Sequence, residues 1–131
     1  MANLDKEQAI HAFWSSFNLA AYDESTVPTE ENAPDFPYIT YNVVTDSFDG
    51  TDADTAMYAS LWYKSRSWAD ITAKKDEISE AIGYGGKRIP IDGGYLWIKR
   101  GTPFAQRLAD DSDDTIRRIY INISVSFLTA N

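Results

Sequence analysis

The chain contains no cysteine and only one histidine, His11, among its 131 residues. The lack of cysteine excludes disulfides, thiolate metal sites and thiol nucleophiles, and it suits a reducing compartment. A single histidine disfavours a zinc site, and a Ser-His-Asp triad would have to be built around His11. No serine lies in a Gly-x-Ser-x-Gly segment. We therefore predict that His11 is a partly exposed helix residue and that the protein is not an enzyme.

Long apolar runs and a surplus of basic residues are also missing. No run approaches the roughly 20 apolar residues that span a bilayer, and the N-terminal residues do not have the pattern of a signal peptide. We expect a soluble protein, made in a cytoplasm and without a membrane partner. The 20 acidic and 12 basic residues give a net charge of −8, which disfavours nonspecific binding to nucleic acid. The length and the 44% hydrophobic content fit a single domain, 1–131.

Hydrophobic periodicity predicts two amphipathic helices. The first covers residues 3–19, with Asn3 or Asp5 as its N-cap. The second begins at Ser67, where Ser-Trp-Ala-Asp resembles a capping box closed by Asp70, and ends at Gly83. The apolar faces consist of Ile10, Phe13, Trp14 and Phe17 in the first helix and of Trp68, Ile71, Ile78 and Ile82 in the second.

Alternation of apolar and polar residues predicts strands at 38–44, 55–64, 87–91, 95–100 and 118–127. The last run is the clearest, because every odd position from Ile119 to Phe127 is apolar and every even one is polar. Such strands belong to a sheet that is covered on one side. Residues 21–37, which contain three prolines, are expected to be an irregular connector, and residues 46–54 and 101–115 to be loops.

The predicted order is helix, strand, strand, helix, strand, strand, strand. Short links between consecutive strands favour antiparallel pairing, and each helix has one apolar face to bury. The sequence therefore predicts an α+β fold: a largely antiparallel or mixed sheet of about four to five strands with two helices packed on one side.

Two groups of residues could hold a ligand, and neither has the required pattern. The glycines at 83–86 follow a helix, whereas a phosphate-binding loop follows a strand and opens a helix. The acidic clusters lack the order of an EF-hand loop, so we interpret them as solvated acids, with a loose divalent site as the alternative. We predict no metal and no cofactor. The acids concerned are Asp46, Asp49, Asp52 and Asp54, and Asp110, Asp111, Asp113 and Asp114.

Aromatic and basic residues suggest a protein interface. Tyr58 and Trp62 lie on the strand face opposite Met57 and Leu61, so both faces of this strand are apolar. The alternative is that a helix or the proline-rich connector covers them. Paired cations place one charge on each sheet face, which favours ion pairs with a protein over contacts with nucleic acid. The predicted interface residues are Tyr58, Trp62, Phe104, Arg107, Arg117 and Arg118.

Five sequence segments, occurring in this order, resemble those of a known protein family. They are Tyr38-Ile-Thr-Tyr41, Ala59-Ser-Leu-Trp-Tyr63, Gly93-Gly-Tyr-Leu-Trp-Ile98, Gly101-Thr-Pro-Phe-Ala-Gln-Arg107 and Arg117-Arg-Ile-Tyr-Ile-Asn122. Together they resemble the minor capsid or tail completion proteins of long-tailed phages and prophages of Gram-positive bacteria. The order of elements is similar to that of the tail terminator fold.

The resemblance implies a structural protein of the virion neck, made in the host cytoplasm. Such proteins form a hexameric ring at the head-proximal end of the tail tube, end tube growth and join the tail to the head connector. The implied partners are further copies of the chain, the tail-tube protein and the head-completion or connector protein. Genomic DNA would pass through the lumen without specific binding, and the acids named above would line that lumen. In such a ring, Phe104 and Arg107 of the 101–115 loop would be anchoring contacts. The alternatives are a head-completion, stopper or tail-tube protein, or an unrelated enzyme or small-molecule binding domain.

Overall fold

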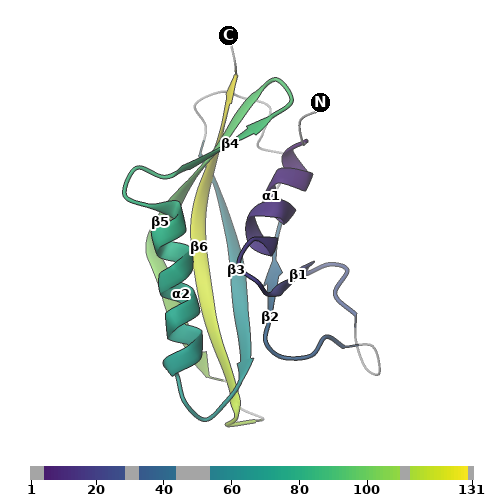
Figure 1. Ribbon diagram of the computed structural model, residues 1–131, viewed down its shortest axis with the longest axis vertical. Helices are drawn as coiled ribbons and strands as arrows, with labels where there is room; N and C mark the ends of the chain where they lie inside the picture. The colour runs from purple at the N-terminus through teal and green to yellow at the C-terminus, as the bar shows by residue number, and fades with distance from the viewer. Residues whose placement is uncertain (1–4, 29–32, 44–53, 110–112, 130–131) are drawn as a thin grey trace.

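The computed structural model describes residues 5–28, 33–43, 54–109 and 113–129. Within these residues, two helices and six strands follow one another (Figure 1). They are α1 (Lys6–Ser15), β1 (Ala20–Asp23), β2 (Tyr38–Tyr41), β3 (Asp54–Lys64), α2 (Ala69–Ile82), β4 (Lys87–Ile91), β5 (Gly94–Ala109) and β6 (Ile116–Thr129).

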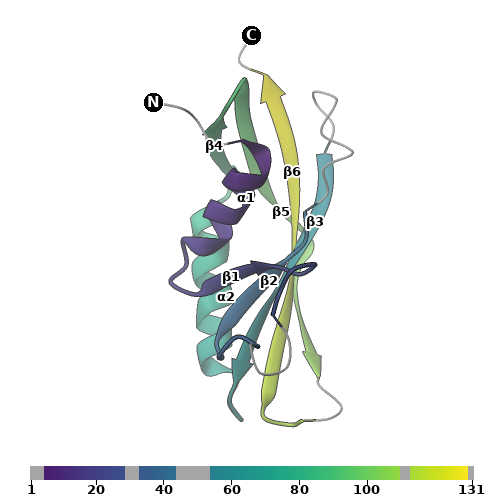
Figure 2. The same cartoon turned by 90° about the vertical axis from the view of Figure 1, so that its right-hand side faces the viewer.

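All six strands form one mixed sheet with the order β1-β2-β3-β6-β5-β4. β1 pairs with β2 in parallel, and the other neighbours are antiparallel. Both helices lie on the same face of this sheet, so the domain has two layers (Figures 1 and 2). The predicted α+β class, with two helices on one side of a mixed sheet, is confirmed.

The core lies between the helices and the sheet. Every predicted apolar residue of the first helix is at most 3% exposed. The four odd-numbered residues of β6 from Ile119 to Val125 are at most 2% exposed, whereas its even-numbered neighbours from Arg118 to Ser124 are half-buried. The alternation in this strand therefore separates the covered face from the opposite one, as predicted.

The prediction of four to five strands was wrong by one, because β1 extends into the start of the connector predicted at 21–37. Its four residues pair in parallel with β2, Ala20 opposite Tyr38 and Asp23 opposite Tyr41. Three of these four residues are half-buried, so no alternation reveals the strand. Its existence depends on a partner that lies beyond the proline-rich segment, and local sequence carries no sign of that pairing.

The prediction of a loop at 101–115 was also wrong, because strand β5 continues to Ala109. The register of β5 against β6 shifts between Arg100 and Ala105, which marks an irregularity of the β-bulge kind. At this point, Gly101 approaches the backbone of Asn122 so closely that an added Cβ would lie 2.9 Å from its carbonyl carbon. The amide Nδ2 of Asn122 donates to the carbonyl of Pro103 at 3.1 Å. Glycine and proline here shape a strand and do not end it.

The helix ends differ from the prediction by a few residues. Asp5 is the N-cap of α1, where its carboxylate accepts from the Gln8 N–H at 2.8 Å and its own N–H donates to Gln8 Oε1 at 3.0 Å. The other candidate cap, Asn3, lies outside the described residues. The first helix ends at Ser15 and not at residue 19, since Asn18 has a left-handed φ of 61° and leads into β1.

The second helix has a simpler start than predicted. Ser67 Oγ accepts from the Ala69 N–H at 3.0 Å, but Trp68 occupies the N-cap position without a side-chain cap, so no capping box with Asp70 forms. Gly83, with φ of 75°, follows the last turn as predicted. The turn at 83–86 then connects α2 to the edge strand β4.

Candidate interaction surface

A row of aromatic and cationic side chains crosses the sheet face that the helices leave uncovered. Tyr38, Trp62 and Arg118 are opposite one another on β2, β3 and β6. The Tyr38 and Trp62 rings stack with centroids 6.0 Å apart, and the Arg118 guanidinium carbon lies 4.6 Å from the Trp62 centroid. Stacked rings and a cation over a ring are favourable geometries. We call this surface the open face.

Two buried hydroxyls fix the members of this row. Thr40 Oγ1 accepts a hydrogen bond from Trp62 Nε1 at 2.9 Å, and Ser60 Oγ accepts from Arg118 Nε at 3.0 Å. Thr40 and Ser60 are only 9% and 2% exposed. Because the ring and the guanidinium are held in place, the row would lose little side-chain entropy on contact with another molecule.

The connector is tied to the open face at Tyr58. The Tyr58 hydroxyl donates a hydrogen bond to the carboxylate of Glu24, and its ring lies 5.0 Å from that of Tyr120. The bond to Glu24, with desolvation as a smaller cause, raises the pKa of Tyr58 to about 12. The connector thus covers part of the open face, as the alternative sequence interpretation expected.

A cavity of about 430 Å³ lies between the connector and the open face. Val27, Pro28 and Pro34 line it from the connector, and Tyr38, Trp62 and Arg118 line it from the sheet. Desolvation in this region raises the pKa of Tyr38 above its ordinary value. We call this hollow the connector cavity. Its walls contain apolar rings, the cation of Arg118 and the carboxylate of Glu24.

A second cluster lies on the helix-covered side of the sheet. Trp68, at the start of α2, has the guanidinium of Arg107 4.7 Å from its ring centroid and that of Arg117 5.2 Å from it. Arg117 also donates to the carbonyls of Asp114 at 2.7 Å and Arg66 at 2.8 Å. Through these contacts, Arg107 of β5 and Arg117 of β6 attach the start of α2 to the two strands.

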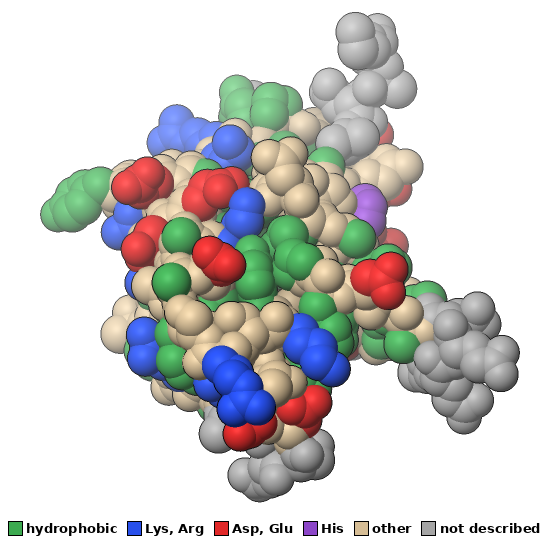
Figure 3. All heavy atoms as spheres, turned by 60° about the horizontal axis from the view of Figure 1, so that its bottom comes forward, with side chains coloured by type: hydrophobic (Ala, Val, Ile, Leu, Met, Phe, Trp, Pro, Cys, Tyr) green, Lys and Arg blue, Asp and Glu red, His purple; other side chains and the backbone are tan. Residues whose placement is uncertain are grey.

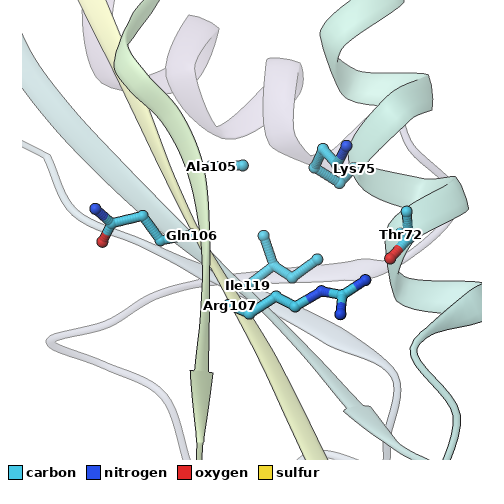
Figure 4. A pocket seen from close by; sticks show the side chains of 6 residues that line it. All are labelled: Thr72, Lys75, Ala105, Gln106, Arg107 and Ile119. Atoms are coloured by element: carbon cyan, nitrogen blue, oxygen red, sulfur yellow. The ribbon is translucent and has the colours of Figure 1, made fainter.

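Beside this cluster, a cleft of about 190 Å³ separates α2 from β5. Arg107 and Lys75 lie toward it, whereas Gln106 projects from the other side of β5 (Figure 4). Lys75 is already paired with Asp76 at 2.6 Å. Of the two cations that line this cleft between the two layers, Lys75 is therefore partly neutralised within the chain.

The predicted interface residues do not form one patch. Tyr58, Trp62 and Arg118 lie together on the open face, while Arg107 and Arg117 lie on the helix side. Phe104 is half-buried in β5 and packs against the core cluster. Side-chain alternation along a strand separates residues that are close in sequence, and the bulge in β5 adds a shift that the sequence pattern does not reveal.

The described acids of the two predicted sets lie near opposite ends of the long strands. Asp54 begins β3 opposite Ser126, and Lys64 ends it opposite Ile116, close to Asp113. The ten residue steps between them correspond to about 33 Å of strand. The remaining acids, Asp46, Asp49, Asp52, Asp110 and Asp111, lie outside the described residues.

The two described acids next to β6 already have partners. Asp113 lies 3.9 Å from Lys64, and Asp114 lies 3.8 Å from Arg66. At this end of the molecule, acidic and basic side chains lie next to one another on the surface (Figure 3). Asp113 also accepts from the Thr115 hydroxyl and N–H, and these bonds lower its pKa. Part of the negative charge here is therefore balanced within the chain.

Both ring nitrogens of the single histidine lie within hydrogen-bond distance of hydroxyl groups of the chain. His11 Nδ1 lies 2.8 Å from the Tyr41 hydroxyl, and Nε2 lies 3.2 Å from Ser15 Oγ. Within the described part of the chain, no three His, Asp or Glu side chains gather in a way that could hold a metal ion. Neither α1 nor α2 is long and apolar enough to cross a membrane.

Sequence reasoning missed one exposed aromatic residue. Tyr84 lies in the turn at 83–86 and has a relative exposure of 104%, whereas Tyr95, the next most exposed large apolar residue among those described, has 43%. The glycines around Tyr84 indicated only a turn. A large aromatic side chain among turn glycines was the signal that could have identified it.

Comparison with known proteins supports the fold. No protein-family model and no curated protein sequence matches the chain. A chain in the solved structure of the virion of a native gene transfer agent particle is similar in fold, with a TM-score of 0.60 and 20% sequence identity. The similarity covers 94% of both chains, so it extends over nearly all of the two-layer fold.

Proposed function

We propose that this protein is a structural component of a tailed phage or phage-like particle. It forms a ring at the head-proximal end of the tail tube, ends tube growth and joins the tail to the head connector. The observation that carries the proposal is the similarity in fold to a virion chain over 94% of both chains. The sequence segments that resemble tail completion proteins support the more specific position in the virion neck. We propose no catalytic activity.

The distribution of surfaces supports assembly into a ring. A closed ring of identical subunits needs two different patches on each subunit, one of which fits the other on the next copy. The open face carries aromatic rings and an arginine, the residue types that dominate binding energy in protein interfaces. β1 and β4 are the outermost strands of the sheet, so the domain offers two unlike edges.

The positions of the acids constrain how a subunit would lie in the ring. Asp54 and Asp113 are separated by nearly the full length of β3. Asp54 and Asp113 can both line one channel if the long strands run along the channel axis. In that orientation, one acidic end meets the tail tube and the other meets the head connector, and repulsion from DNA phosphates keeps the genome free to slide.

The test is deletion of the gene from a producing strain, followed by electron microscopy of the particles. We expect tails of uncontrolled length that fail to join heads, and recovery of normal particles when the intact gene is supplied in trans. Antibody labelling should place the protein at the top of the tail. Normal, joined tails after deletion would overturn the proposal. Label elsewhere in the particle would favour another head-completion, stopper or tail-tube component.

A further inference from the structure

Tyr84 is held outside the body of the domain by a fixed turn. The Gly86 N–H donates to the Gly83 carbonyl at 3.4 Å, and Trp97 Nε1 donates to the Gly85 carbonyl at 2.9 Å. Gly86 has a φ of 85°, and a Cβ there would collide with Trp97 Nε1. We call residues 83–86 the Tyr84 turn. Its backbone is ordered by these contacts, although the Tyr84 side chain packs on nothing in its own chain.

The Tyr84 turn and the connector cavity are at opposite sides of the sheet. The turn leads directly into β4, one edge strand, whereas the cavity lies beside β2 and the connector that follows β1, the other edge strand. Figure 1 shows the α2–β4 turn and the β1–β2 connector on opposite sides of the molecule. A projection on one edge and a hollow at the other form the two unlike patches that a heterologous contact needs.

The chemistry of the two patches is complementary. The cavity of about 430 Å³ has walls of tyrosine, tryptophan and proline and includes Arg118, whose Nε is held by Ser60. An inserted tyrosine ring would bury its apolar surface on these rings, and its hydroxyl would reach a charged hydrogen-bond partner. Burial of an exposed tyrosine in such a pocket is typical of an interface hot spot.

Charged residues on the β4 side of the turn and on the connector wall of the cavity have opposite signs. Lys87 and Arg88, which follow the turn, are exposed cations. Glu24, which lines the cavity, and Asp35, in the connector close to it, are exposed acids. Opposite charges across an interface favour the correct orientation and speed association. This complementarity within one sequence identifies a second copy of the chain as the occupant.

Extension of the sheet from copy to copy is a less suitable contact. Pro90, the fourth of the five residues of β4, has no N–H to donate, and the charged Lys87 and Arg88 precede it. β1 has only four residues. Both edge strands are therefore poorly suited to pairing with a strand of another copy. Insertion of a side chain is a contact that needs no such pairing.

We propose that the Tyr84 turn of each copy inserts its tyrosine into the connector cavity of the next copy. This inference rests on the proposed function and extends it, because it specifies how neighbouring subunits of the ring are joined. The contact is heterologous, so repetition of it around an axis closes a ring when the rotation per subunit divides a full turn.

Absence of cysteine from the chain allows a direct test by disulfide trapping. Tyr84→Cys and Ala33→Cys, the second at an exposed residue that lines the cavity, are made in separate full-length chains. Mixed and treated with oxidised glutathione, the two variants should form a disulfide-linked dimer. A chain with both substitutions should form a ladder of linked oligomers that stops at the ring size. Tyr95→Cys, another exposed tyrosine, is the control and should link to Ala33→Cys at least about 10-fold more slowly.

A second measurement uses no cysteine. Sedimentation of the chain over a wide concentration range should show self-association that Tyr84→Ala weakens about 10-fold or more, as for a hot-spot residue. The urea unfolding curve should stay unchanged, because Tyr84 makes no packing contact in its own chain. Tyr84→Phe should retain most of the association if ring burial dominates.

Several outcomes would overturn the inference. These are equal linking of the Tyr84→Cys and Tyr95→Cys chains, unchanged self-association of Tyr84→Ala, and a chain that stays monomeric and unlinked at every concentration. Linking of Tyr84→Cys only to a different protein in isolated particles would also reject a second copy as the occupant. If deletion of the gene disturbs tail length but Tyr84→Ala restores normal particles, only this contact fails. If deletion leaves tails normal, the proposed function fails, and the cysteine pair still reports whether copies join in this way.

Discussion

The guanidinium carbon of Arg118 lies 4.6 Å from the centroid of the Trp62 ring, while its Nε donates to the buried Ser60 hydroxyl. One side chain thus links two strands through a ring contact and a hydrogen bond. Arg118→Ala removes both and leaves the Ser60 hydroxyl without this partner, so we expect a loss of about 1–2 kcal/mol in the free energy of unfolding. Urea denaturation measures it.

The matched control for Arg118 is Arg66→Ala. Arg66 forms an ion pair with Asp114 at 3.8 Å, and both side chains are about 80% exposed. Exposed pairs of this kind stabilise proteins little, so the loss should stay below about 0.5 kcal/mol. Equal losses for the two arginines would contradict the role that we assign to Arg118.

The hydrogen bond from Tyr58 to Glu24 predicts a change of stability at high pH. It raises the pKa of Tyr58 from 10.0 to about 12. Since the folded state holds this proton more tightly, the stabilisation is complete below pH 10 and is lost as the pH rises from 10 to 12. Tyrosine-selective ¹³C NMR should follow one ring that titrates near pH 12. Glu24→Gln should bring its pKa down toward 10, whereas Glu80→Gln should leave it in place.

Asp113 predicts a change at low pH with the opposite sign. Hydrogen bonds from the Thr115 hydroxyl and N–H, with Lys64 nearby, lower the pKa of Asp113 below 3.8. The stabilisation is therefore complete above pH 3.8 and is lost as the pH falls below that value. Melting temperatures between pH 2 and 6 should show a smaller acid loss in Asp113→Asn. Thr115→Val should have part of this effect, and Thr102→Val, which removes an exposed hydroxyl, should have none.

Gly101 and Gly85 form a matched pair for the bulge in β5. A Cβ at Gly101 would lie 2.8–2.9 Å from atoms of Asn122, two of them backbone, whereas a Cβ at Gly85 would meet nothing within 4 Å. Gly101→Ala should cost about 1–3 kcal/mol, because the strands must shift apart. Gly85→Ala should change stability by less than about 0.5 kcal/mol. A thermal unfolding series that finds the two variants equal would contradict the close approach at the bulge.

Much of the fold could be predicted because its signals are local. The apolar residues of α1 recur at helical spacing, and those of β6 alternate, so each segment could bury one face in only one conformation. Both faces were assigned correctly. The edge strand β1 and the continuation of β5 could not be predicted, because each exists through pairing with a distant strand.

The candidate site was predictable only in part for the same reason. Alternation placed Tyr58 and Trp62 on the face opposite the core, which is correct. It could not tell that the connector would fold back over them and leave a cavity beside Arg118. Arg107 and Arg117 were grouped with these residues, although they contact Trp68 on the helix side.

The sequence by itself determined the class of the fold, the buried face of each long element and the lack of thiol chemistry, because these depend on residue type and spacing within one segment. The tertiary structure decided which residues meet. It joined Tyr38, Trp62 and Arg118 across three strands, placed Asp54 about 33 Å along β3 from the end near Asp113, and left Tyr84 exposed on the edge opposite the connector cavity. The physical reason is that strand order and register are set by pairing between distant segments, which no local pattern records.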